Sequence, residues 1–173
     1  VDGALNLALS ELVDQDPQTR QAGLDRLHAL SRRPGVSPTM AARLQGYRGW
    51  ARARGLAAEA DGGDAVGADT IALVQAGLQV EPDNPSLNWA LAHLRDAQAT
   101  SAADRAEVHA LYRRAAEAGH GEAAWQVGMQ YINGDGIEAD PVAGFEWVSR
   151  SARLGFESGL VSLAVMHAVG QGT

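Results

Sequence analysis

The residues best suited to chemistry are five histidines: His28, His93, His109, His120 and His167. A helical zinc site of the metalloprotease type needs two histidines four residues apart, with a glutamate next to the first. No pair in this chain has that spacing. His93 and His109 fall on neighbouring predicted helices, where a metal pair is conceivable. The spacing favours surface or helix-packing roles, and we predict neither a metal nor a cofactor.

The carboxylates also lack a recognisable catalytic or metal-binding arrangement. Gly134-Asp135-Gly136, followed by Glu138 and Asp140, is suggestive of a calcium loop. It lacks the alternating oxygen ligands and the terminal glutamate of an EF-hand. No nucleophile elbow, phosphate-binding glycine loop or Ser/His/Asp set is present. We predict a protein that is not an enzyme, with catalysis by the histidines and carboxylates as an alternative.

Composition narrows the class of partner. The 173 residues carry a net charge of −7, and all 14 basic residues are arginine. Residues 1–60 hold eight arginines and six acids, giving +2, whereas residues 61–173 hold six arginines and fifteen acids, giving −9. Phosphate binding needs clustered cations, so nucleic acid is disfavoured. No apolar run approaches the roughly 20 residues that span a bilayer, so we predict no membrane insertion.

The elements that must position these residues are predicted to be helices. Four pairs place a capping residue before a proline, the arrangement typical of a helix start. Asp69 is expected to cap a further helix, and the helix that begins near Pro38 is expected to reach about Ala60. We predict an all-α protein with about nine helices and no sheet. The four pairs are Asp16-Pro17, Ser37-Pro38, Asn84-Pro85 and Asp140-Pro141.

A period of 36 residues organises the second half of the chain. Gly119 recurs as Gly155, and Gly134 recurs as Gly170. The same shift places Trp89 over Trp125. A fixed period of this size indicates a solenoid of helix pairs, in which a repeated tryptophan favours packing over binding.

Residues Tyr112 to Gly155 resemble a Sel-one-like repeat (SLR), a relative of the tetratricopeptide repeat with a longer loop between its paired helices. The resemblance covers about residues 104–172 and implies a right-handed α-solenoid of antiparallel helix pairs. Gly128 is expected to let two helices approach closely, and Trp147 to bridge one helix pair to the next. The chain departs from the family at Gly144, where alanine is usual, and at His167, where tyrosine is usual. The matching positions are Ala123, Gly128, Tyr131, Gly134, Gly136, Ile137, Asp140, Trp147, Ala152 and Gly155.

These patterns predict three parts. Residues 1–60 form an N-terminal helical segment, and residues 61–68 form a loop. Residues 69–173 form a repeat array with SLR units, and we expect the native chain to continue beyond a truncated last repeat.

The resemblance implies a scaffold or adaptor that binds a partner protein or peptide in a concave groove, in a bacterial envelope or secretion assembly. The periplasm or envelope is the expected compartment, with the cytoplasm as the alternative. Other roles left open are an immunity or effector-binding inhibitor and a polysaccharide-binding protein with Trp125 and Tyr131 as stacking surfaces. The residues expected to face the partner are Glu122, Trp125, Gln126, Met129, Gln130, Asn133, His93, Ser162 and Met166.

Overall fold

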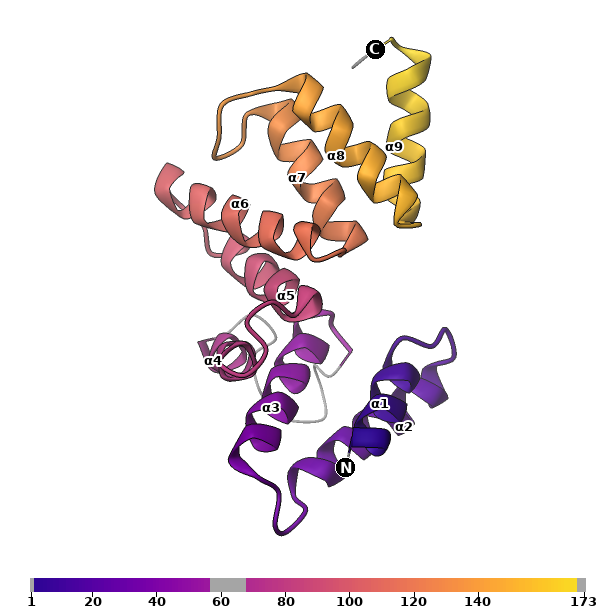
Figure 1. The fold of residues 1–173 in the computed structure, drawn as a ribbon, viewed down its shortest axis with the longest axis vertical. Coiled ribbons are helices and arrows are strands. Elements are labelled where there is room, and N and C mark those ends of the chain that lie inside the picture. Colours follow the sequence, from indigo (N-terminus) through magenta and orange to yellow (C-terminus); the bar gives the residue numbers. More distant parts are fainter. Residues whose placement is uncertain (1, 57–67, 171–173) are drawn as a thin grey trace. The chain divides into compact units, whose positions relative to one another are not determined.

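The computed structural model describes residues 2–56 and 68–170 (Figure 1). Within these ranges the chain forms nine helices and no strand, so the all-α prediction is confirmed. In the described ranges no helix is long and apolar enough to cross a membrane. The helices are α1 (Asp2–Leu12), α2 (Pro17–Ser31), α3 (Pro38–Ala53), α4 (Ala68–Leu78), α5 (Pro85–Asp96), α6 (Ala102–Glu117), α7 (Gly121–Asn133), α8 (Pro141–Arg153) and α9 (Glu157–Ala168).

The four predicted cap-and-proline pairs all begin helices. The side chains of Asp16, Ser37, Asn84 and Asp140 each accept a backbone N–H from the first turn, and proline follows at the first helical position. Each cap satisfies a donor that the helix itself leaves unpaired. Proline has no N–H to leave unpaired there, so the two residues together define the start of the helix.

Two predicted helix boundaries were wrong. The third helix ends at Ala53 rather than near Ala60, and Gly55 follows it with a φ of +69°. Residues 57–60 lie outside the described ranges. Asp69 lies in the first turn of α4, which begins at Ala68, so it is not the residue before the helix. A carboxylate in that turn still complements the positive end of the helix dipole.

Helix α6 begins with a capping box that the sequence interpretation missed. The Ser101 hydroxyl accepts the Asp104 N–H, and the Asp104 carboxylate accepts the N–H groups of Thr100 and Ser101. These bonds lower the pKa of Asp104 to about 2, because they favour its charged form.

The chain divides into two compact units, Val1–Pro82 and Asp83–Thr173. In the first, α1 packs on α2 and α3 packs on α4. Their contact surfaces bury Leu5, Leu27, Leu44 and Val74. The division falls after Pro82, later in the chain than the loop predicted at 61–68, of which only Ala68 lies in the described ranges.

In the second unit each helix from α5 to α9 packs on the next (Figure 1). The 36-residue period is visible in the backbone. Gly119 and Gly155 lie two residues beyond the ends of α6 and α8, with φ of +98° and +80°. Gly134 and Gly170 follow α7 and α9 with φ of +71° and +68°. Glycine adopts this left-handed conformation without the steric cost that a β-carbon adds.

Helices α7 and α8 approach closely at Gly128, as predicted. A β-carbon added there would lie 2.7 Å from Val148 Cγ2 and 3.0 Å from the Gly144 carbonyl oxygen. Gly144 itself faces Ile132 and the Gly128 carbonyl, so the departure from alanine suits the close contact. Trp147 is only half-buried on α8.

Candidate functional site

Helix α7 carries most of the predicted contact residues, and polar groups hold both of its ends. At the start, His120 Nδ1 accepts the Ala123 N–H at 3.2 Å. At the other end, the Gly134 N–H donates to the Gln130 carbonyl at 2.8 Å. Local hydrogen bonds therefore define both ends of the helix.

Two predicted site residues from different repeats lie together. The Trp125 indole N–H donates to Ser162 Oγ at 2.9 Å, joining α7 to α9. The Trp125 ring also lies 6.1 Å from the ring of Phe156, centroid to centroid. Both Trp125 and Ser162 are partly exposed. The indole is thus held in place while part of its surface stays accessible.

Four other predicted residues lie on or beside the same surface of α7. Glu122, Gln126 and Met129 are partly exposed, and Asn133 is exposed at the last residue of the helix. Their spacing of three or four residues puts them on one face of the helix. The structure therefore brings together a mixed polar and apolar strip that continues from Trp125.

His93 lies one repeat earlier, on α5. Its exposed ring stacks on Trp89 with centroids 5.1 Å apart, and His120 stacks on Trp89 at 5.5 Å. Trp89 itself is 4% exposed. Trp125 lies 36 residues after Trp89, and Phe156 lies 36 residues after His120. The aromatic contact of Trp89 with His120 therefore recurs one repeat later as that of Trp125 with Phe156.

Gln130 and Met166 are buried, with exposed fractions of 8% and 5%. They occupy equivalent repeat positions. Gln130 Oε1 lies 3.0 Å from His109 Nδ1, and the Tyr131 ring packs edge-on against His109 with centroids 5.2 Å apart. Burial lowers the pKa of His109, because the charged imidazolium loses its hydration there. These side chains support the surface from beneath and are not free to contact a partner.

The groups considered for chemistry have structural partners. His93 stacks on Trp89, whereas His109 bonds to Gln130. Asp135 forms an ion pair with Arg105 at 2.7 Å, and Asp140 caps α8. Among residues 2–56 and 68–170 no group of three or more His, Asp or Glu side chains is placed to hold a metal ion.

Sequence reasoning missed an open hollow on α8, lined by arginines and aromatic rings. Its volume is about 510 Å³. Arg150 and Arg153 lie in the last turn of α8, where the helix dipole stabilises cations. Their positions in the sequence therefore gave no sign of a binding site. The lining residues are Phe145, Glu146, Trp147, Ser149, Arg150 and Arg153.

Comparison with known proteins identifies the fold. No protein-family model and no curated protein matches the chain. A protective antigen of uropathogenic Escherichia coli strains that displays an SLR fold aligns with a TM-score of 0.66 at 19% identity, covering 99% of this chain and 34% of that one. A Sel1 repeat protein from Oxalobacter formigenes aligns with a TM-score of 0.64 at 19% identity, covering 99% and 65%. The chain thus spans about a third of the first protein and just under two thirds of the second. The predicted resemblance is confirmed at the level of the fold: the chain has an SLR-type fold.

Proposed function

We propose that the chain is a non-enzymatic interaction scaffold that binds a partner protein or peptide across α7 and the neighbouring side of α9. The observation that carries this proposal is the Trp125–Ser162 hydrogen bond, beside which Gln126 and Met129 are partly exposed. The partner is expected in a bacterial envelope or secretion assembly, the setting that the family resemblance implies.

The physical case rests on the state of Trp125. Tryptophan is enriched among interface residues whose truncation costs most affinity, because it buries a large area and has few rotatable bonds. Here the indole N–H already has an acceptor and the ring lies against Phe156. A partner that covers the remaining exposed surface therefore loses little side-chain entropy on binding, because the ring is already ordered.

The fold supports the same proposal. Repeats of paired helices stack so that successive first helices present one extended surface, which such proteins use for binding. Helices α5, α7 and α9 occupy that position in the second unit, and they carry all the predicted contact residues. We expect Gln130 and Met166 to contribute by packing beneath the surface.

Site-specific photocrosslinking tests the proposal. Benzoylphenylalanine would replace Gln126 in the full chain, in the cells that naturally produce it, and Ala110, exposed on α6, would serve as the matched control. We expect one discrete crosslinked protein from position 126 and none from position 110. The Gln126→Arg change should then weaken binding of the purified partner at least about tenfold, because it places a bulky charge in the contact.

Equal crosslinking from both positions would show that α7 is not a selective surface. Retained partner affinity in both Gln126→Arg and Trp125→Ala would likewise reject this face. Circular dichroism on each variant distinguishes lost contact from lost folding, since Trp125→Ala also removes the bond to Ser162.

A further inference from the structure

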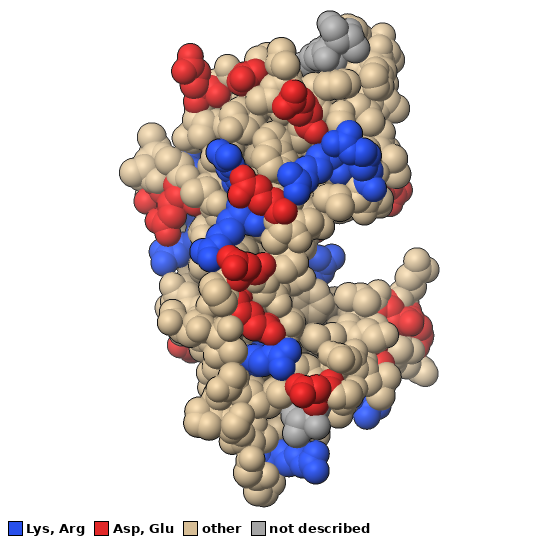
Figure 2. Space-filling view, viewed as in Figure 1, with Lys and Arg blue, Asp and Glu red and all other residues tan. Residues whose placement is uncertain are grey.

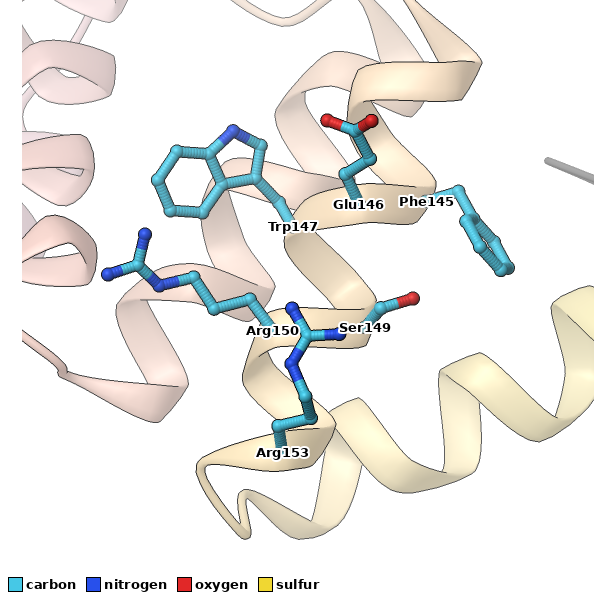
Figure 3. A pocket seen from close by; sticks show the side chains of 6 residues that line it. All are labelled: Phe145, Glu146, Trp147, Ser149, Arg150 and Arg153. Carbon is cyan, nitrogen blue, oxygen red and sulfur yellow. The ribbon is translucent and has the colours of Figure 1, made fainter.

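The hollow on α8 combines aromatic surface with two arginines. In Figure 3 the side chains of Trp147, Arg150 and Arg153 lie along one side of the helix, and Phe145 points to the other. This surface belongs to α8, whereas the surface proposed above belongs to α7 and α9. The two can therefore be tested separately.

Arg150 is held in a defined position. Its guanidinium carbon lies 5.2 Å from the centroid of the Trp147 ring. Its Nη2 donates to the Glu117 carbonyl at 3.0 Å, at the end of α6. A guanidinium has five N–H donors, so this single bond leaves most of them available. Stacking on the ring and the bond to α6 fix the orientation of those donors before any ligand arrives.

Arg153 is exposed one turn further along α8, and it forms no ion pair or hydrogen bond with any residue of the described ranges. Glu146 stands four residues before Arg150, the spacing at which helical ion pairs form. Arg150 instead turns to Trp147 and Glu117. The hollow thus keeps two cations without a carboxylate partner.

The charge around the hollow contrasts with the chain that contains it. Residues 61–173 carry −9, yet arginine is the more frequent charged residue here. On the face drawn in Figure 2, arginines and carboxylates are interspersed, with several side chains of opposite charge side by side. Two cations without carboxylate partners beside aromatic rings suit a ligand that brings its own carboxylates.

We propose that the α8 hollow binds an acidic peptide segment of a partner protein, with one carboxylate on Arg150, one on Arg153 and an apolar side chain against Trp147. This site goes beyond the scaffold surface on α7 and does not depend on it. Glu146 opposes the ligand charge and limits the number of carboxylates that the hollow accepts.

The test uses the full chain, labelled with nitrogen-15, and an acetylated, amidated peptide of sequence Ala-Glu-Phe-Glu-Glu-Ala. We expect saturable chemical-shift changes at the Trp147 indole N–H and at the Arg150 and Arg153 Nε–H signals. Arg153→Gln should weaken binding about three- to fivefold, since an exposed ion pair contributes modestly. Glu146→Gln should strengthen binding by a similar factor, because it removes a like charge.

Arg33→Gln is the matched control, because Arg33 is exposed and lies in the other unit. If Arg33→Gln and Arg153→Gln lower the peptide affinity equally, the peptide responds to the overall charge of the protein, and the proposed site is wrong. Absence of saturable binding, or shifts confined to α7 and α9, would overturn it too. Gln126→Arg, which tests the scaffold surface, should leave peptide affinity unchanged, so failure of one proposal is distinguishable from failure of the other.

Discussion

Two edge-to-face ring pairs occupy equivalent positions in successive repeats. His109 meets Tyr131 with centroids 5.2 Å apart and planes at 89°, and Phe145 meets His167 at 5.4 Å and 88°. Each residue of the second pair lies 36 positions after its counterpart. In the first pair the histidine is on α6 and the tyrosine on α7, whereas in the second pair phenylalanine is on α8 and the histidine is on α9. His167 therefore packs where the family usually has tyrosine. The same edge-to-face contact is thus made by a His–Tyr pair in one repeat and by a Phe–His pair in the next.

This equivalence gives a direct mutational prediction. His109→Phe removes the partner of buried Gln130 and should lower the free energy of unfolding by about 1–3 kcal/mol, the cost of an unsatisfied buried polar group. The double change His109→Phe with Gln130→Met copies the residues found 36 positions later. We expect it to recover most of the loss, as measured by urea unfolding. Losses in the two single variants that simply add up in the double variant would contradict the proposed coupling.

His109 also predicts how stability depends on pH. Burial lowers its pKa in the folded chain below the unfolded value of about 6.5. The unfolded chain therefore binds more protons below that pH, and stability is lost as the pH falls through 6.5 toward the folded pKa. The urea midpoint should be lower at pH 5.5 than at pH 7.5. The double variant should show a smaller pH difference, and an unchanged difference would assign the effect to another group.

Sequence pattern predicted the surface residues better than the buried ones. Glu122, Gln126 and Met129 followed from helical spacing, and they are partly exposed. Gln130 is one position from Met129 on the same helix, but its side chain packs toward His109 on α6. Spacing within one helix does not specify the direction of the preceding helix, which decides whether a residue at the margin of a face is buried.

At the scale of elements, the α7–α8 contact depends on the absence of a side chain. The region around Gly128 contains backbone atoms of Gly144 and Val148 at 3.0 Å from an added β-carbon. Backbone cannot rotate away as a flexible side chain can. An added methyl group would therefore push the two helices apart along their whole contact.

Gly128→Ala should destabilise the chain by about 1–3 kcal/mol through overpacking, partly offset by the roughly 1 kcal/mol by which alanine favours a helix. Gly3→Ala is the matched control, since Gly3 lies in α1 with no atom within 4 Å of an added β-carbon. Thermal unfolding followed by circular dichroism compares the two. A Gly128→Ala variant as stable as Gly3→Ala would show that the helices can separate without cost.

Helix starts were the most predictable elements because their signals are local. A capping side chain and a proline act within four residues, and Asn84-Pro85 and Asp140-Pro141 both begin helices. Asp104 lies 36 residues before Asp140, but the two aspartates cap their helices in different ways. Asp140 precedes its helix, whereas Asp104 is the third residue of α6, behind Ser101. The end of α3 was missed because its apolar pattern extends past Ala53, although the helix does not.

At the scale of the molecule, both proposed surfaces belong to the second compact unit, Asp83–Thr173. Its core includes Leu87, Leu94, Tyr112 and Val127, all fully or almost fully buried. The repeat pattern predicted this array, while the division after Pro82 depends on which helices pack together. Helix α4 packs on α3, the helix before it in the chain, and local turn signals do not specify which neighbouring helices pack together.

A fragment of residues 83–173 should therefore fold alone. In repeat proteins stability comes from each repeat and its contacts with immediate neighbours, so an array of five packed helices keeps most of its own stabilising contacts. We expect helical circular dichroism, a cooperative thermal transition, and the same affinity for the Ala-Glu-Phe-Glu-Glu-Ala peptide as the full chain. A fragment that melts without cooperativity would show that the second unit needs the first. A folded fragment with changed peptide affinity would instead show that residues 1–82 contribute to the α8 site.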